Sequence, residues 1–383
     1  CGHRTPFTLN LDAIQLQTNE EHTNKIMLTD TVGVVMKYPT PEDTVSDELK
    51  VFDLVVNCVD QIFDEQQVYS TADESKEEIE KFIDSLTSEQ FERIAKMDIS
   101  VEVEEVGEPL HWRTRVTATT DSNGALGFYS SRSHRVVPVK DCLIALPEIG
   151  IAAMSTQKLS PDVRIEIAYS SEGERMVAEA PKSGDGKFRQ NTGPAVLHER
   201  VGEELLQVSQ RSFWQGHKRA PEVLTEVVRN FAQLQEGEVV LDLYGGVGLF
   251  TSACLKDVGA SGSIHLIEGS KDATADAKNN FASQSNVEIS TGDVAKIITR
   301  INRADVVILD PPREGAGKEV VQEITRLTPR SIVYVACDPA ALARDTAYLK
   351  ENGYNLEKIR AFDLFPMTHH IESIALFSPS KVS

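Results

Sequence analysis

The residue best suited to act as a nucleophile is a single thiol near the end of the chain. Cys337 ends the apolar run 332–336 and is followed by Asp338 and Pro339. β-Branched residues that end in this way predict a buried parallel strand, which delivers the thiol to the carboxyl edge of a sheet, where open α/β sheets bind ligands. A lone cysteine is also a common small core residue. The segment 365–372 ends in Glu372, a candidate general base, and favours the catalytic interpretation.

A glycine-rich turn follows the apolar strand 239–243. Such a turn lets a ligand approach the backbone, and the helix after it presents its N-terminus. Carboxylates also follow the next two strands, where they can meet ribose hydroxyls and an adenine amino group. Because the spacing lacks G-x-G-x-x-G, S-adenosylmethionine is favoured over NAD. The candidate cofactor-binding residues are Asp242, Tyr244, Gly245, Gly246, Gly248, Glu268 and Asp293.

The fourth predicted strand ends in Asp310-Pro311-Pro312-Arg313. Paired prolines fix the backbone after a strand. The Asp310 carboxylate can accept a hydrogen bond from a ring N–H, and Arg313 can donate to a phosphate or a carbonyl. An ordinary Asp-Pro-Pro turn is the alternative interpretation.

The elements that must position these residues divide the chain into three parts. Residues 1–97 predict an acidic, mainly helical segment, with helical spacing of apolar residues over 49–63 and 75–97 and a capping pattern at 87–90. Residues 98–215 alternate apolar and polar side chains, which predicts a β-rich central domain. Its expected turns lie at 121–124 and 183–186.

Residues 216–383 alternate between strand and helix patterns, which predicts an α/β fold with a mostly parallel, Rossmann-like sheet. One helix is expected at 222–234. The expected strands are 239–243, 263–267, 287–290, 305–309, 331–335 and 374–377.

The composition limits the partners and the compartment. The net charge of −20 opposes nucleic-acid binding, but residues 1–97 hold 8 basic and 20 acidic residues, which leaves only −8 for the rest. Five widely spaced cysteines without a C-x-x-C pair indicate a reducing compartment. Without a long apolar stretch or a signal-peptide pattern, the sequence predicts a cytoplasmic monomer with no membrane partner.

From about Ile99 to Phe377 the chain resembles the bacterial RNA uracil-C5 (5-methyluridine) methyltransferases, which act on transfer RNA or large-subunit ribosomal RNA. The resemblance covers nearly three-quarters of the chain, and its last two segments are the most specific. The matching segments are Ser212-Phe-Trp-Gln215, Leu241-Asp-Leu-Tyr-Gly-Gly-Val-Gly248, Asp310-Pro-Pro-Arg-Glu-Gly315, Tyr334-Val-Ala-Cys-Asp-Pro-Ala-Ala-Leu-Ala-Arg-Asp345 and Asp363-Leu-Phe-Pro-Met-Thr-His-His-Ile-Glu372.

The resemblance implies S-adenosylmethionine-dependent methylation of a uridine in a ribosomal or transfer RNA stem-loop. It places Gln215, Gly245, Glu268 and Asp293 at the cofactor, and Asp310 against both cofactor and base. Cys337 is implied as the nucleophile and Glu372 as the general base. His370 is expected to form a hydrogen bond with the target uracil or to orient it. Candidate RNA contacts are Arg313 and the phosphate-facing Arg113, Arg115, Arg132, His134, Arg135, Lys140, Lys218, Arg219 and Arg344.

The chemistry explains these residue types. Carbon 5 of uracil is a poor nucleophile, so a thiolate must first add at carbon 6. After methyl transfer, a general base must remove the proton on carbon 5 before the thiolate can leave. A free thiol has a pKa of ~8.5, so the site must lower it or accept its proton, and the sequence does not show which neighbour does so.

Two departures from the family pattern are visible. Many members bind an iron–sulfur cluster with three upstream cysteines and a later one, which Cys142 matches. The upstream trio is missing, so we expect neither a cluster nor another metal site. Residues 1–97 do not resemble the family's RNA-binding barrel. They resemble a tailed-phage baseplate hub or assembly protein, which implies a composite chain and a protein partner for this segment.

Two other functions remain open at this point. In one, the chain is a non-catalytic binding or structural protein whose phage-like segment carries the function. In the other, it methylates cytosine or DNA. Cytosine-C5 enzymes tend to place a Pro-Cys nucleophile after the fourth strand, and the absence of cysteine at 310–312 disfavours that reading.

Overall fold

The computed structural model describes residues 87–130, 133–182, 189–366, 368 and 370–380 and four short strands before them. These strands form a sheet in the order β1-β2-β3-β4. The helices expected over 49–63 and 75–86, the turn at 183–186 and Arg132 lie outside the described residues. The strands are β1 (Leu16–Thr18), β2 (Lys25–Leu28), β3 (Val35–Lys37) and β4 (Val68–Tyr69).

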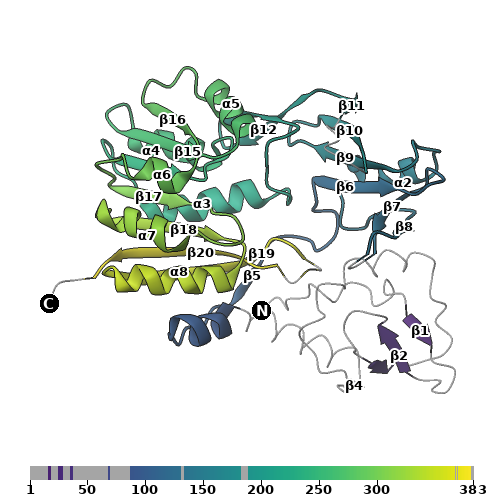
Figure 1. Ribbon diagram of the computed structural model, residues 1–383, viewed down its shortest axis with the longest axis horizontal. Coiled ribbons are helices and arrows are strands. Elements are labelled where there is room, and N and C mark those ends of the chain that lie inside the picture. The colour runs from purple at the N-terminus through teal and green to yellow at the C-terminus, as the bar shows by residue number, and fades with distance from the viewer. Residues whose placement is uncertain are drawn as a thin grey trace.

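The C-terminal domain is built on an eight-stranded sheet in the order β16-β15-β14-β17-β18-β20-β19-β5 (Figure 1). β20 is antiparallel to both of its neighbours, and the other pairings described in this sheet are parallel. The mostly parallel sheet predicted from the sequence is confirmed. Its strands are β5 (Val103–Glu105), β14 (Val239–Leu243), β15 (Ser263–Glu268), β16 (Val287–Thr291), β17 (Val306–Leu309), β18 (Ser331–Ala336), β19 (Tyr354–Asp363) and β20 (Glu372–Pro379).

Helices cover both faces of this sheet. Successive residues of a strand point to opposite faces, so Val240 packs with α3, α4 and α5 whereas Leu241 packs with α6, α7 and α8. Both side chains are fully buried. The helices are α3 (Ala220–Ala232), α4 (Leu249–Val258), α5 (Lys271–Asn280), α6 (Val294–Ile298), α7 (Gly317–Arg326) and α8 (Pro339–Glu351).

The expected strands of this domain lie within one or two residues of the observed ones, except at the C-terminus. The strand expected at 374–377 extends over 372–379 and runs antiparallel to β18. β19 was not predicted, because charged residues at 357, 358 and 360 interrupt its apolar pattern and its first half is largely exposed.

Residues 87–105 pack onto the C-terminal domain. Residues 87–90 are helical and lead into the π-helical turn η4 (Phe91–Ala95), whose Phe91 is fully buried in the core of α6, α7 and α8. β5 then pairs with β19 at the sheet edge. Elements on both sides of residue 98 therefore complete the C-terminal domain in the structure, whereas the sequence predicted a domain boundary at this residue.

Replacing Phe91 by alanine should destabilise the whole domain. Large-to-small substitution of a fully buried aromatic residue leaves a cavity and costs about 3–5 kcal/mol. Denaturant unfolding of the full chain measures the change, and Glu92→Ala, at the exposed neighbouring position, is the matched control. Equal stability of the two variants would contradict the packing of η4 as core.

The central domain contains a six-stranded antiparallel sheet in the order β11-β10-β9-β6-β7-β8. The turn predicted at 121–124 is confirmed: Asp121 accepts the N–H groups of Asn123 and Ala125, each at 2.8 Å, and Gly124 has a positive φ. The elements are β6 (Arg115–Thr120), β7 (Leu126–Tyr129), β8 (Val136–Pro138), η5 (Pro147–Ile149), α2 (Ile151–Ser155), β9 (Val163–Tyr169), β10 (Arg175–Pro181) and β11 (Arg189–Thr192).

An antiparallel hairpin, β12 (Val196–Val201) and β13 (Glu204–Ser209), joins the central sheet to the C-terminal domain. Figure 1 shows β12 between the central strands and α5. Among the described helices, none has the length and apolar composition that a bilayer crossing requires.

Candidate active site

Three predicted catalytic side chains meet at one edge of the C-terminal sheet. Asp310 directly follows β17, and Cys337 directly follows β18. Glu372 is the first residue of β20, and because β20 runs against β18, its start lies beside the end of β18. The pairing of Ala336 with Ser373 places the thiol and the carboxylate next to each other.

Burial and mutual repulsion raise the pKa of each of these groups. Burial raises the pKa of Asp310 to about 7, helped by the charges of Asp242 and Glu268. Burial also raises the pKa of Glu372 well above its usual range, with a contribution from Asp310. Burial raises the pKa of Cys337 to about 11; the nearby carboxylates add to this and Arg313 opposes it. A cation brought to this edge would relieve the repulsion.

The glycine turn after β14 is open on one side only. A Cβ at Gly245 would lie 2.6 Å from Leu266, and one at Gly248 would lie 2.2 Å from Phe281. A Cβ at Gly246 would meet nothing within 4 Å, and this residue has a φ of +56°. The turn is therefore packed against the domain except at Gly246, which leaves backbone accessible to a ligand.

Two carboxylates frame this opening. Glu268 accepts the N–H of Gly246 at 3.0 Å and that of Ser270 at 2.6 Å. One oxygen of Asp242 accepts the N–H and the hydroxyl of Thr251 at 2.9 and 2.6 Å. Its other oxygen, Oδ1, is buried without a protein partner, and burial raises the pKa of Asp242 to about 6. An unpartnered buried acceptor is costly, and it fits a bound donor such as a ligand ammonium group.

Two further predicted cofactor residues, Asp293 and Tyr244, lie near α6. Asp293 caps α6 by accepting the N–H of Ala295 at 3.0 Å, and its side chain remains half exposed. Tyr244 adopts a left-handed conformation with φ of +61° and packs against the core of α6, α7 and α8. Burial raises the pKa of Tyr244 to about 12.

A fully buried carboxylate holds the loop that carries Asp310. Asp345 accepts the Tyr334 hydroxyl at 2.7 Å and the N–H groups of Ala316 and Gly317 at 2.8 and 3.1 Å. It also pairs with Arg344 at 2.8 Å, and Arg344 donates to the Glu314 carbonyl at 2.6 Å. The structure thus gives Arg344 an internal role in this loop, and its expected contact with RNA phosphate stays a prediction.

Aromatic contacts tie the segment before Glu372 to the central domain. Trp112, fully buried, stacks on His217 at 5.5 Å and meets Phe365 edge-on at 6.2 Å. Phe365 in turn meets His370 at 6.1 Å, and His370 lies 3.3 Å from Arg313. The predicted substrate-binding pair of His370 and Arg313 is therefore together, beside the catalytic edge.

The segment 212–215 presents one exposed aromatic ring. Thr114 donates its hydroxyl to the carbonyls of Gln215 and Gly216 at 3.4 and 3.1 Å, which fixes the end of the segment. Gln215 and Trp214 are buried, whereas 70% of Phe213 is exposed. Packing is thus the observed role of Trp214, and Phe213 is the ring available to a partner.

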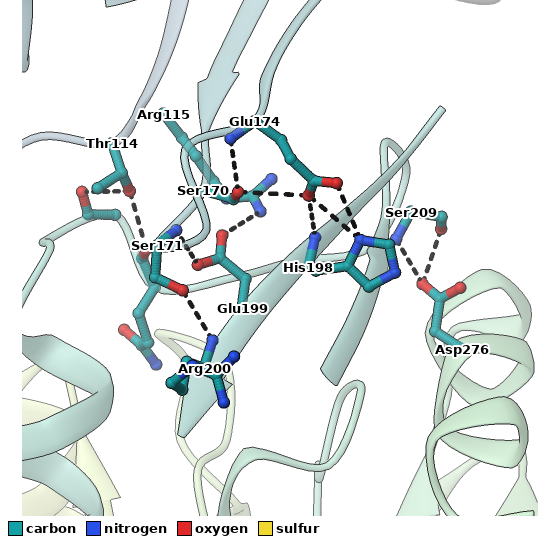
Figure 2. Close-up of polar contacts among 12 residues, drawn as sticks. Thr114, Arg115, Ser170, Ser171, Glu174, His198, Glu199, Arg200, Ser209 and Asp276 are labelled. Atoms are coloured by element: carbon teal, nitrogen blue, oxygen red, sulfur yellow. Dashed lines mark hydrogen bonds and ion pairs between the residues drawn. The ribbon is translucent and has the colours of Figure 1, made fainter. Parts of the chain in front are cut away.

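Two of the expected phosphate contacts, Arg115 and Arg219, have carboxylate partners within the protein. Arg115 pairs with buried Glu199 at 3.3 Å, and Glu199 also accepts the N–H of Ser171 at 3.0 Å (Figure 2). Arg219 lies 3.7 Å from Glu222. In the described part of the chain, no three His, Cys, Asp or Glu side chains are grouped so that they could hold a metal ion.

Sequence reasoning did not identify Phe213, nor the α5 residues Asp276 and Asn280. Phe213 is distinguished by the exposure of its ring in the structure, and the sequence pattern does not predict that exposure. Asp276 and Asn280 sit in an ordinary helical pattern, and only their partners on β13 distinguish them.

Comparison with protein families separates the chain into two regions. The family described as tRNA (Uracil-5-)-methyltransferase matches residues 204–379. The family described as T4 bacteriophage base plate protein matches residues 1–104. Both resemblances noted in the sequence are thereby confirmed.

Curated relatives agree with the first match. An uncharacterized RNA methyltransferase of Streptomyces avermitilis is 37% identical over 297 residues, which cover 72% of this chain and 69% of the relative. One from Corynebacterium glutamicum is 32% identical and covers 76% of this chain and 73% of the relative. In both comparisons, the matched part therefore makes up a similar share of this chain and of the relative.

Among solved structures, the fold is similar to that of the Pyrococcus abyssi tRNA (uracil-54, C5)-methyltransferase in complex with S-adenosyl-L-homocysteine. The TM-score is 0.64, over 78% of this chain and 83% of that one, at 22% identity.

Proposed function

Because the chain belongs to the RNA methyltransferases, with a catalytic domain of the tRNA (uracil-5) type, we propose that it methylates carbon 5 of a uridine through a covalent bond between Cys337 and carbon 6. S-Adenosylmethionine is the methyl donor in this family. The observation that carries the proposal is the meeting of Cys337, Asp310 and Glu372 at one sheet edge.

The residues around the glycine turn fit this cofactor. Gly246 leaves its backbone open, and the free Oδ1 of Asp242 can accept from an ammonium group. Glu268 and Asp293, at the ends of β15 and β16, are proposed to hold the ribose and the adenine. When bound, the cofactor supplies an electrophilic methyl group on a positively charged sulfur, which the acidic edge accommodates.

The proposed covalent step begins at Cys337. Its thiolate adds to carbon 6, and the electrons of the carbon 5–carbon 6 double bond move toward the carbonyl at carbon 4. Asp310 is proposed to accept a ring N–H and hold the base in plane. Carbon 5 then attacks the methyl group, and the carbon–sulfur bond of the donor breaks with its electrons on the donor sulfur.

Glu372 completes the reaction as general base. Its carboxylate takes the proton from carbon 5, the carbon 5–carbon 6 double bond reforms, and the thiolate of Cys337 leaves. A carboxylate whose pKa is raised is a stronger base, which suits this step. Because the pKa of Cys337 is also raised, to about 11, we expect its thiolate to form only when cofactor and RNA occupy the site.

Cofactor affinity should depend on pH. Binding of a cationic donor favours ionised Asp310, whose pKa is about 7 in the free protein, so binding releases a proton below that pH. The Kd should fall by up to about tenfold per unit as pH rises from about 5.5 to about 7, and then level off. Asp242, with a pKa of about 6, contributes at the lower end.

Isothermal titration over this pH range measures the effect. S-Adenosylhomocysteine, which lacks the sulfonium charge, and the Asp310→Asn variant should both show a shallower slope. A Kd for S-adenosylmethionine that is constant across the range would contradict the electrostatic role given to Asp310.

The RNA target is proposed to be an exposed loop of a folded RNA. Base modification requires the nucleotide to leave its stack, which loops permit at low cost. Phe213, exposed and two residues before the buried Gln215, offers a ring on which a base can stack. Incubation with labelled S-adenosylmethionine and cellular RNA, followed by mass mapping, tests this. 5-Methyluridine at defined transfer or ribosomal RNA positions supports it, whereas no labelled uridine product overturns it.

The segment before residue 87 is proposed to be a separate interaction module for a protein partner. Its support is the match of residues 1–104 to a phage base plate protein, a kind of protein distinct from the methyltransferases. A chain that begins at residue 87 keeps η4 and β5 and should still methylate RNA. Complete loss of activity in a folded chain of this length would show that the module takes part in catalysis.

A further inference from the structure

One helix, α5, contacts both the cofactor turn and the segment that presents Phe213. Its N-cap residue Ser270 donates its N–H to Glu268 at 2.6 Å, so the helix begins at a proposed ribose ligand. Asp276 and Asn280 are four residues apart and therefore share a face of the helix. That face meets β13 and the turn 245–248.

Asn280 joins the turn to β13. Its Oδ1 accepts the N–H of Gln207 at 2.7 Å, and its Nδ2 donates to the carbonyl of Gln207 at 3.1 Å. The same Nδ2 donates to the carbonyl of Val247 at 3.1 Å, inside the glycine turn. Backbone groups from two separate segments, β13 and the glycine turn, therefore form hydrogen bonds with both the oxygen and the nitrogen of this amide.

Asp276 holds the start of the segment that carries Phe213. One oxygen of this buried carboxylate accepts the N–H and the hydroxyl of Ser209, each at 2.8 Å, and the hydroxyl of Ser212 at 2.6 Å (Figure 2 shows the bonds to Ser209). Hydrogen bonds to a buried charge are among the stronger ones in proteins. Since Thr114 fixes the other end at Gln215, the exposed Phe213 lies between two anchors.

We propose that Asp276 and Asn280 are positioning residues through which cofactor binding orders the RNA-binding segment 209–215. A ligand at Gly246 and Glu268 fixes the turn and the start of α5. Because Asn280 and Asp276 form hydrogen bonds with β13 and Ser212, fixing α5 also restricts the motion of β13 and of the segment that follows it. The inference rests on the proposed function for the role of Phe213, whereas the coupling itself needs only the cofactor site.

Hydrogen exchange tests the coupling with S-adenosylhomocysteine as the only ligand. In the full chain, saturating ligand should slow amide exchange in residues 205–216 by at least about fivefold, the lower end of typical coupling between sites. Asn280→Asp keeps the acceptor for Gln207 but loses both donated bonds, so the slowing should vanish. Asn279→Asp, the same change at an exposed neighbouring position, should retain it.

Equal slowing in Asn280→Asp and wild type, or none in wild type, overturns the inference. If Asn280→Asp does not fold, Asp276→Asn supplies the same comparison, with Asp98→Asn, at an exposed position outside α5, as its control. In methylation assays, Asp276→Asn should raise the RNA KM at least about fivefold. Because coupling between two binding sites is reciprocal, it should also raise the S-adenosylmethionine KM at saturating RNA by a similar factor, whereas kcat should change little. A wild-type chain that shows the exchange effect but methylates no RNA would refute the proposed function and leave the coupling intact.

Discussion

Cys337→Ala should abolish methyl transfer, with kcat reduced on the order of 10⁵-fold, as for removal of other covalent nucleophiles. Without the sulfur, carbon 5 of the base does not become nucleophilic, although cofactor and RNA still bind. Incubation with RNA that contains 5-fluorouridine makes the difference visible. Fluorine at carbon 5 cannot be removed as a proton is, so the wild-type protein should remain covalently bound to the RNA and migrate as a complex under denaturing conditions.

The control is another cysteine of the same domain. Cys254 lies fully buried in α4, where burial raises its pKa far above the usual range. Cys254→Ala should therefore keep both methylation and the trapped complex. A complex that persists in Cys337→Ala, or is absent from active wild-type protein, would refute the covalent mechanism.

Glu372→Gln should lower turnover by about 10³-fold, a usual loss when a general base is removed, while the covalent adduct accumulates on ordinary uridine. The amide cannot take the proton from carbon 5, so the reaction stops after methyl transfer. Gel analysis of RNA–protein complexes with unmodified RNA measures the accumulation. Because the pKa of Glu372 is raised, wild-type turnover should still increase with pH above the range in which an ordinary glutamate is already ionised.

Glu351→Gln, at an exposed position at the end of α8, is the matched control and should turn over normally. Loss of turnover in Glu372→Gln without any adduct would place this residue before the covalent step and contradict its role as the base for carbon 5.

The positions of the proposed catalytic residues could be predicted because strand ends are easy to locate in a parallel sheet. Asp310 and Cys337 each follow a short β-branched run, and adjacent parallel strands end at one edge. The reversed direction of β20 follows from no local pattern. Only the pairing of β20 with β18 shows why Glu372, at the start of a strand, reaches the same edge.

Protonation and long-range contacts could not be predicted. The raised pKa of Cys337 comes from burial and from carboxylates on other strands, whose distances a sequence does not give. β5 pairs with β19, which lies about 250 positions later in the chain. A strand of only three residues has no sequence pattern that predicts such a distant partner. The ion pair between Arg344 and the fully buried Asp345 was not predicted either, because nothing in the sequence marks Asp345 as buried.

The base plate match overlaps elements of the C-terminal domain, which matters for experiments on the first quarter of the chain. The base plate match runs to residue 104, yet η4 and β5 belong to the C-terminal domain in the structure. A truncation at residue 98 would remove Phe91 from the core and confuse instability with loss of function. A first residue at 87 avoids this.

The place of β20 in the sheet also bears on synthesis of the protein. This strand fills the gap between β18 and β19, and its first residue is Glu372. A ribosome that stops before residue 372 therefore releases a chain with the nucleophile but with neither a continuous sheet nor the base. Such a chain would expose strand edges and be open to proteolysis rather than persist as a half-active enzyme that leaves RNA trapped on Cys337.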